Sequence, residues 1–329
     1  GRVAEAFKGA LRAQGMIAKI SGRDHVTIEG WQTVGSMLGV FAVRESVDAI
    51  PWPEETPSGL QAMRDAGKEF GYTASYSARR ADGSIVGGAE DKAVRDAIAS
   101  GVIPGPRVIT SLGSLNENAG PPDSVRAVVR RFKERGADVI KIFASKSIRD
   151  GGAQTMTQEQ LDVACSEAKA QGLRSVVHAH SADAAKAAVR AGCTQVDHGV
   201  LVDAEALQMM ARAGTYFEPQ CELIFRNYLD NKEWFRGIGN YNDEGFAAME
   251  ASIPLRKGLA EKWRSTPGIK VVYGTDAVAG AHGQNARDLV CRVRSLGQPA
   301  MEALISATSL SAESRGLGNV IGRIAPGYE

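Results

Sequence analysis

The 329-residue sequence has no run that approaches 18 consecutive apolar residues, so no segment is expected to cross a membrane. Its 39 basic and 38 acidic side chains are interleaved rather than grouped in blocks. It therefore lacks the charged stripe that a nucleic-acid groove or an anionic membrane surface requires. Neither nucleic acid nor a membrane is expected as a partner. A small-molecule substrate is expected instead, and homo-oligomer formation is left open.

Cysteine is scarce, and the four cysteines are scattered without a Cys-x-x-Cys pair: Cys165, Cys193, Cys221 and Cys291. In a chain of this length, this distribution predicts buried, reduced thiols rather than a disulfide framework. Residues 1–4 also lack the apolar core of a secretory signal. Both observations favour a cytoplasmic protein.

Several catalytic motifs are absent. The sequence contains no Gly-x-Ser-x-Gly elbow of a serine hydrolase and no Gly-x₄-Gly-Lys-Ser/Thr phosphate loop. Residues 237–240 (GIGN) lack the third glycine and the preceding strand of a dinucleotide-binding fingerprint. What the sequence does have is 43% hydrophobic residues, enough to bury the core of one large α/β domain or of a barrel with a small appendage.

From residue 107 onward, short apolar runs alternate with amphipathic stretches of helical period. The predicted strands lie at residues 107–110, 137–144, 174–179, 195–199, 215–219 and 269–274. The predicted helices lie at residues 122–136, 157–172, 182–192, 203–214, 286–296 and 301–308. Thr157 and Gln160 have the spacing of a capping box at the start of one helix. Repeated strand–helix units indicate a parallel sheet.

Two weaker runs, residues 38–43 and 71–78, bring the predicted strands to eight. Eight such units favour a closed (β/α)₈ barrel of the TIM type over an open sheet. The expected domains are a small β-rich appendage, the barrel, and a C-terminal segment that returns toward the appendage, at residues 1–33, 34–312 and 313–329 respectively.

Polar residues interrupt or end four of the predicted strands: Lys141, His178, His180, His198 and Asp276. The C-terminal ends of barrel strands meet at one mouth, so these side chains are expected to converge. A single histidine at a strand end is more often structural, and an aspartate after Gly-Thr is common in turns. Lys141 is harder to explain in this way, because an unpaired ammonium in an apolar strand is costly. Together the residues favour a joint catalytic or metal-binding site.

The order and spacing of these residues resemble the amidohydrolase superfamily, in particular its imidazolonepropionase-like and Xaa-Pro-dipeptidase-like branch. The similarity covers roughly residues 92–329. The matching segments are IPGPRV at 103–108, GADVIK at 136–141, HAH at 178–180, DHG at 197–199, GTDA at 274–277, NARDL at 285–289, AT at 307–308 and GRIAPG at 322–327.

The resemblance implies that Lys141 is carboxylated and bridges two metal ions, and that His178 and His198 bind the second of them. Asp276 would bind the first metal and carry the proton, and His180 would contact the substrate. Carboxylation converts a buried cation into an anionic oxygen ligand that suits Zn²⁺, with Mn²⁺ or Fe²⁺ as alternatives. Water on such a metal loses its proton near neutral pH and attacks an amide carbonyl.

The sequence departs from the family at the first barrel strand, where members carry a His-x-His pair. No histidine lies between His25 and His178, and Phe41 and Val43 occupy the best-matching positions. The metal content is therefore left at one or two ions. The leading interpretation is a metal-dependent hydrolase of amide bonds in an N-acyl amino acid, a dipeptide or a cyclic amide. The alternatives are a fold member without catalytic metal that binds a ligand or partner, and a mononuclear lyase or decarboxylase.

Two further segments are expected near the barrel mouth. His282 follows Asp276 on the same loop and is a candidate substrate contact, although a solvated loop histidine is equally consistent with the sequence. Residues 221–264 read as a long helical insertion. Its aromatic and charged part, residues 225–231, is expected over the mouth as a lid or as an oligomer contact.

Overall fold

The computed structural model describes residues 91–102, 105–236, 240–278 and 280–329, together with the backbone of five strands nearer the N-terminus. Its contacts divide the chain into two compact units, Gly1–Thr110 and Ser111–Glu329. Each unit is described by itself. The domain limits expected from the sequence stay predictions.

The first unit contains antiparallel strands. These are a hairpin of β1 (Ile17–Ile20) and β2 (Arg23–Val26), and a sheet of β3 (Val40–Ile50), β4 (Gly71–Arg80) and β5 (Ile85–Gly87), followed by helix α4 (Asp91–Ala99). Phe41 in β3 lies opposite Arg79 in β4. The expectation that residues 38–43 and 71–78 are parallel barrel strands is therefore wrong. An apolar run identifies a strand, but it carries no information about the direction of its partner.

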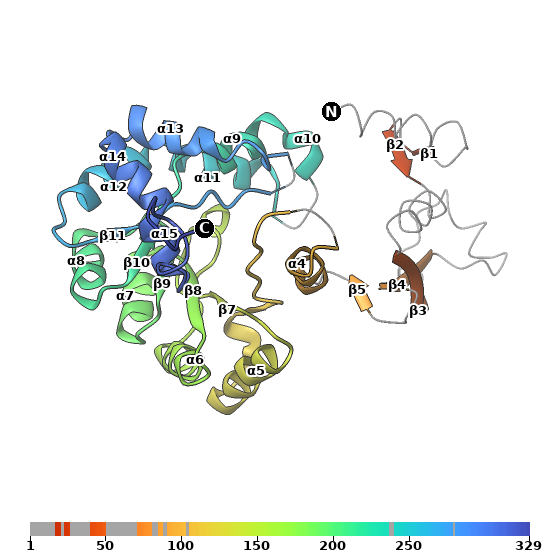
Figure 1. The fold of residues 1–329 in the computed structure, drawn as a ribbon. Helices are drawn as coiled ribbons and strands as arrows, with labels where there is room; N and C mark the ends of the chain where they lie inside the picture. Colours follow the sequence, from red (N-terminus) through yellow and green to blue (C-terminus); the bar gives the residue numbers. More distant parts are fainter. Residues whose placement is uncertain are drawn as a thin grey trace. The chain divides into compact units, whose positions relative to one another are not determined.

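The second unit is built on a six-stranded parallel sheet with alternating helices (Figure 1). The strands run in chain order: β6 (Ser114–Leu115), β7 (Val139–Phe143), β8 (Arg174–Ser181), β9 (Gln195–Leu201), β10 (Tyr216–Glu218) and β11 (Lys270–Val271). The intervening helices are α5 (Pro122–Glu134), α6 (Gln158–Ala170), α7 (Ala182–Arg190) and α8 (Ala204–Ala213), with 3₁₀ turns η2 (Glu117–Ala119) and η3 (Ile148–Asp150). This arrangement confirms the predicted α/β, TIM-like barrel class.

The strand expected at residues 107–110 is absent from this sheet, and β6 lies a few residues later. Most side chains of residues 105–110 are exposed, including that of Ile109, and only Thr110 is buried. A strand inside a parallel sheet is covered on both faces, so this exposed segment does not meet the requirement.

The helix starts follow the local sequence. At the start of α6, the Gln160 amide N–H donates to the Thr157 hydroxyl over 3.1 Å, and the Thr157 N–H donates to the Gln160 side chain over 3.1 Å. This confirms the predicted capping box, which satisfies two backbone donors that have no partner inside the helix. Ser181 and Asp203 cap α7 and α8 in the same manner.

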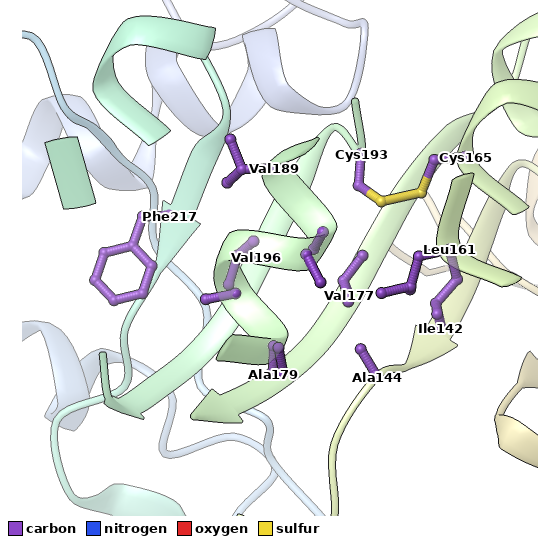
Figure 2. Close-up of a cluster of buried hydrophobic side chains, with 14 of the residues drawn as sticks. Ile142, Ala144, Leu161, Cys165, Val177, Ala179, Val189, Cys193, Val196 and Phe217 are labelled. Carbon is purple, nitrogen blue, oxygen red and sulfur yellow. A yellow bond between two sulfur atoms is a disulfide. The ribbon is translucent and has the colours of Figure 1, made fainter. Parts of the chain in front are cut away.

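The side chains of each strand alternate between the face of the sheet that packs against the helices and the opposite face. Ile140, Ile142, Val177, Ala179 and Val196 belong to the main hydrophobic core, and Figure 2 shows several of them beside α6 and α7. Because successive side chains of a strand point to opposite faces, Lys141, His178 and His180 lie on the other face. The apolar positions thus fix which polar side chains face away from the helices.

The expected helical insertion consists of α9 (Leu223–Asp230), α10 (Lys232–Phe235), α11 (Asp243–Ser252) and α12 (Leu255–Arg264), and the chain continues through α13 (Ala286–Arg294), α14 (Ala300–Ala307) and α15 (Ser309–Ser314). Phe225 and Tyr228 of α9 are buried in a second core cluster that includes Ile148. Within the described residues, no helix has the length and apolar character needed to traverse a bilayer.

The N-terminal ends of three strands contact the last turn of α15. Glu313 accepts hydrogen bonds from Tyr216 Oη over 2.6 Å and from Lys270 Nζ over 2.8 Å. Arg174 Nη1 donates to the Ser314 carbonyl over 3.2 Å. These partners are the first residues of β10, β11 and β8. One end of the sheet is thereby covered, which leaves the C-terminal strand ends for a site.

The cysteines form two disulfides, Cys165–Cys193 and Cys221–Cys291, so the expectation of four reduced thiols is wrong. The first joins α6 to the segment before β9 inside the main core (Figure 2). The partners are 28 and 70 residues apart in the sequence, so only the fold brings them together. Disulfides persist in oxidising compartments, and the cysteine-based argument for a cytoplasmic protein therefore no longer holds.

Glu167 of α6 links this helix to α5. It accepts hydrogen bonds from Arg130 Nε over 2.8 Å, from Gln171 Nε2 over 2.8 Å and from Arg126 Nη1 over 3.1 Å. The Arg130 and Gln171 hydrogen bonds lower the pKa of this buried carboxyl to about 2. Because the folded-state pKa is depressed, the stabilisation is present above the ordinary value of 4.5 and is lost as the pH falls toward 2.

We expect Glu167→Gln to lower the free energy of unfolding at pH 7 by about 1–3 kcal/mol, because the two arginines lose their charged acceptor. Between pH 4.5 and 2, the free energy of unfolding of the variant should also fall less steeply than that of the wild type. Urea unfolding across that pH range measures both effects, with Glu159→Gln on the exposed face of α6 as the control. Unchanged stability at pH 7, with a pH dependence like that of the wild type, would contradict the assignment.

Candidate active site

Three buried histidines come together beyond the hydrophobic core. The ring centroids of His178 and His180 are 4.7 Å apart, those of His178 and His198 are 4.6 Å apart, and those of His180 and His198 are 5.0 Å apart. His178 and His180 share one face of β8 because they are two residues apart. His198 comes from the neighbouring strand β9, so its ring reaches the other two across the sheet.

The backbone at His198 is unusual. It has a φ of +68°, the following Gly199 has a φ of +56°, and the β8–β9 register shifts at this point. A Cβ on Gly199 would lie 2.5 Å from the Phe217 ring, so the position requires glycine. Among the described residues, three non-glycine positions have positive φ: Leu112, His198 and Asp276. Left-handed conformations cost energy and cluster at functional sites, and two of these three are site residues expected from the sequence.

Lys141 lies in β7 and is paired. Its Nζ donates to Asp197 Oδ2 over 2.9 Å, and Gln195 Nε2 donates to the other carboxylate oxygen over 2.8 Å. Burial on its own raises the pKa of the Asp197 carboxyl, but Lys141 and His198 outweigh it, and the pKa lies below its usual value. The ion pair resolves the cost of placing an ammonium in an apolar strand. Sequence reasoning quoted Asp197 only as part of a motif and did not assign it this role.

The three histidines are held in the neutral form. Burial lowers the pKa of His178 to about 4 and that of His198 to about 3, and it places the pKa of His180 well below its ordinary value. Neutral imidazoles are the form that binds zinc. His178 Nε2 lies 3.3 Å from the Lys146 carbonyl oxygen, whereas His180 Nδ1 is buried without a hydrogen-bond partner in the described part of the chain. Such an orphaned nitrogen fits a metal ion or a substrate group.

Asp276 lies on the loop that follows β11. Although the residue is exposed at the surface, desolvation of its carboxyl raises the pKa to about 6, with Lys141 opposing and Asp197 reinforcing the shift. The carboxylate is therefore within electrostatic range of the Lys141–Asp197 pair. The loop is fixed beside it, because Asn285 Nδ2 donates to the hydroxyl of Thr275 over 2.8 Å. A carboxyl with a pKa near neutrality is suited to accept and return a proton.

Two further polar residues lie behind His198: Gln220 contacts its ring and Glu218 contacts Gln220. Sequence reasoning missed both. Gln220 Oε1 lies 2.8 Å from His198 Nδ1, and Gln220 Nε2 donates to the carboxyl oxygens of Glu218 over 3.0 and 3.1 Å. Burial and then Asp197 raise the pKa of Glu218 well above its usual value. The available signal was an acidic residue that follows two aromatic residues in the predicted strand at 215–219.

The structure places the other residues singled out in the sequence, His282, Phe41 and Val43, away from the contacts of the histidine cluster or outside the described side chains. The side chain of His282 is exposed, and within the described part of the chain it makes no ring contact with the other histidines. Phe41 and Val43 lie in β3, and their side chains are outside the described ones. Burial and a hydrogen bond between the hydroxyls of Tyr228 and Tyr241 raise the pKa of Tyr228, and the negative charge of Asp276 raises it further. The insertion therefore extends into electrostatic range of the site.

A separate group of Cys221, Asp288 and Cys291 has the proximity of metal ligands. Its two sulfur atoms are bonded to each other, however, and Asp288 accepts hydrogen bonds from the backbone N–H groups of residues 221–223 over 2.8, 2.9 and 2.9 Å. A carboxylate that accepts several such donors at the start of α9 acts as a cap. This group fixes a backbone segment rather than forming a second metal centre.

The chain belongs to the amidohydrolase family, whose model matches residues 58–329. Members of this family generally bind metal ions. The histidine cluster fits that property, because it offers neutral nitrogen donors beside a lysine and an aspartate. The two missing histidines of the first strand remain the departure from the family pattern.

Two relatives show what the chain is similar to. It is 26% identical to ochratoxinase from Aspergillus niger over 303 residues, which cover 84% of this chain and 60% of that protein. It thus spans about 60% of the length of this curated relative. A crystal structure of a Xaa-Pro dipeptidase with methionine bound in the active site superposes with a TM-score of 0.64 at 28% identity, over 71% of this chain and 63% of the other. The crystal structure of A. niger ochratoxinase matches with a TM-score of 0.59 at 23% identity over 72% and 61%, which supports the fold alone.

Proposed function

We propose that this protein is a metal-dependent hydrolase of amide bonds in small molecules. The observation that carries the proposal is the cluster of three buried, neutral imidazoles beside Lys141 and Asp276. The names of the two relatives agree, because one is a dipeptidase and the other is an ochratoxinase. The proposed substrates are N-acyl amino acids, dipeptides and cyclic amides.

The residues have separate roles in this proposal. His178 and His198 would hold a divalent metal, which we take to be Zn²⁺ with Mn²⁺ or Fe²⁺ as alternatives. Lys141 would contribute an oxygen ligand once its neutral amine has added to CO₂ and released a proton. When bound, the metal supplies an activated water and polarises the amide carbonyl. Lys141 must leave Asp197 to be carboxylated, because an ammonium has no lone pair to offer. His180 directs its unpaired ring nitrogen at the substrate, and Asp276 carries the proton to the leaving nitrogen.

The order of the proposed substrates follows the related dipeptidase. The crystal structure of the related dipeptidase contains methionine in its active site. Methionine is an amino acid, and hydrolysis of a dipeptide releases free amino acids. We therefore place N-acyl methionine and methionine-containing dipeptides first in a substrate panel, ahead of lactams.

Elemental analysis together with an amide panel tests the proposal. Protein prepared with Zn²⁺ or Mn²⁺ should retain at least one ion per chain and hydrolyse part of the panel. Retention of less than about a tenth of an ion per chain, with no hydrolysis, would instead favour a ligand-binding member of the family. The Lys141–Asp197 ion pair and the absent His-x-His pair are the observations that favour this rival. Retained metal with release of CO₂ or an elimination product would favour the lyase or decarboxylase.

A further inference from the structure

A chain of hydrogen bonds leads from a buried carboxyl to His198. The carboxyl of Glu218 accepts from Gln220 Nε2, and Gln220 Oε1 lies 2.8 Å from His198 Nδ1. All three residues are buried, with exposures of 6%, 4% and 6% respectively. Bulk solvent therefore has little access to either hydrogen bond, and the direction of these hydrogen bonds decides which nitrogen of His198 carries the proton.

The polarity of the Gln220 amide follows from its neighbour. Only the NH₂ end of the amide has protons to donate, and both oxygens of Glu218 lie within 3.1 Å of that end. Reversing the amide would set its oxygen against two carboxyl oxygens, of which at most one can carry a proton, and would set its donors against His198. The observed orientation therefore presents an oxygen, which is an acceptor only, to the imidazole.

An acceptor at 2.8 Å requires a proton on His198 Nδ1. A neutral imidazole has one ring proton, so Nε2 then carries a lone pair. This form is the tautomer that binds a metal through Nε2, and the partner of the other ring nitrogen sets it.

The surrounding backbone keeps Glu218 and Gln220 in place. A Cβ on Gly274 would lie 2.5 Å from the carboxyl carbon of Glu218, so a glycine at this position leaves room for the carboxyl. On the other side, Cys221 follows Gln220 directly, is joined to Cys291 of α13, and donates its N–H to Asp288 over 2.8 Å. The glutamine is thus anchored by its own side chain and by the residue next to it.

We propose that Gln220, oriented by Glu218, is a positioning residue that fixes His198 with its proton on Nδ1 and leaves Nε2 unprotonated for a metal. The use of the Nε2 lone pair as a metal ligand rests on the proposed function. The tautomer itself is a property of the metal-free protein. The two are therefore testable separately.

The tautomer is measured by long-range ¹H–¹⁵N correlation spectra of metal-free protein labelled at its histidine nitrogens, with the His198 signals assigned from a His198→Gln variant. In wild type we expect a protonated Nδ1 and an unprotonated Nε2. In Gln220→Leu, which keeps the volume but removes the acceptor, we expect a substantial population with the proton on Nε2. The affinity for Zn²⁺ in a chelator competition should fall about 10- to 100-fold, the usual cost of losing a partner of a metal-binding histidine.

A second pair of variants addresses the role of Glu218. Glu218→Leu removes the group that orients the amide and should also mix the two tautomers, whereas Glu218→Gln retains an acceptor oxygen and should preserve the proton on Nδ1. Gln195→Leu is the matched control, because Gln195 is a buried glutamine of the neighbouring strand that binds Asp197 instead of a histidine. It should leave the His198 tautomer unchanged. The Glu218 pair also answers the question if Gln220→Leu does not fold.

The inference is overturned if wild-type His198 carries its proton on Nε2, or if the tautomer is the same in wild type, Gln220→Leu and Glu218→Leu. A second outcome is that the wild-type protein binds no Zn²⁺, but the Gln220→Leu variant loses the proton on His198 Nδ1. That outcome would uphold the positioning role while removing the proposed function. Metal-dependent hydrolysis with an unchanged tautomer in all variants would do the reverse.

Discussion

Replacing Lys141 with alanine is expected to remove bound metal and hydrolytic activity together. The variant deletes the residue that would supply the carbamate oxygen in the proposed site, and it leaves only imidazoles and Asp276 as ligands. Loss of a ligand and of the negative charge it brings lowers affinity for a divalent ion strongly. Elemental analysis of the metal-replete variant should find less than about a tenth of an ion per chain, and turnover of any panel substrate should fall to background.

The same variant also leaves Asp197 buried without its cation, so a stability measurement must accompany it. We expect a loss of about 3–5 kcal/mol from an unpaired buried charge, reduced if Asp197 takes up a proton. Lys146→Ala is the matched control, because it removes an exposed lysine from the loop after the same strand. A folded Lys141→Ala protein that keeps its metal would exclude Lys141 as a metal ligand. A Lys146→Ala protein that loses the metal would show that the effect is not specific to Lys141.

Much of the second unit could be predicted from periodicity. The helices and the strands β7 to β10 have strong amphipathic or apolar patterns, and the capping box at Thr157 and Gln160 has a fixed spacing. The candidate site was predictable for the same reason. A polar residue that interrupts an apolar strand is visible in the sequence, and the ends of parallel strands lie on one side of the sheet.

The missed features depend on contacts between distant residues. Strand direction in the first unit, the two disulfides and the Lys141–Asp197 ion pair each join positions that local patterns treat independently. Gln220 is a clear example. Nothing in its neighbours distinguishes it from a surface glutamine, and its role arises only because β9 and β10 are adjacent and place its amide beside His198.

The sequence predicts His198 and Asp276 as site residues but does not predict their backbone conformation. Both residues lie at the sequence positions expected of the site, and both adopt a left-handed conformation that no local motif requires of them. Close packing surrounds both positions, because a Cβ on Gly199 would lie 2.5 Å from Phe217 and one on Gly274 would lie 2.5 Å from Glu218. The fold thus supplies precision that a pattern of residue types cannot specify.

Replacing Asp276 with asparagine is expected to lower turnover by roughly 10²-fold or more while substrate affinity changes little, because asparagine keeps the size and one acceptor oxygen but takes up no proton. The pH profile gives a second readout. The carboxyl must be ionised to accept a proton, and desolvation raises its pKa to about 6, so wild-type activity should fall as the pH drops through about 6. A bound cation would move this limb to lower pH, since it favours the ionised form.

In Asp276→Asn the acid limb should disappear, and the metal content separates the two roles assigned to the residue. His198→Ala is expected to lose metal first and activity as a consequence, whereas Asp276→Asn should retain metal at low activity if proton transfer is its main contribution. Asp183→Asn, on the exposed first turn of α7, controls for the loss of a carboxylate elsewhere in the barrel. Hydrolysis by Asp276→Asn at the wild-type rate would exclude the proton-transfer role, because an amide side chain at this position has no base to offer.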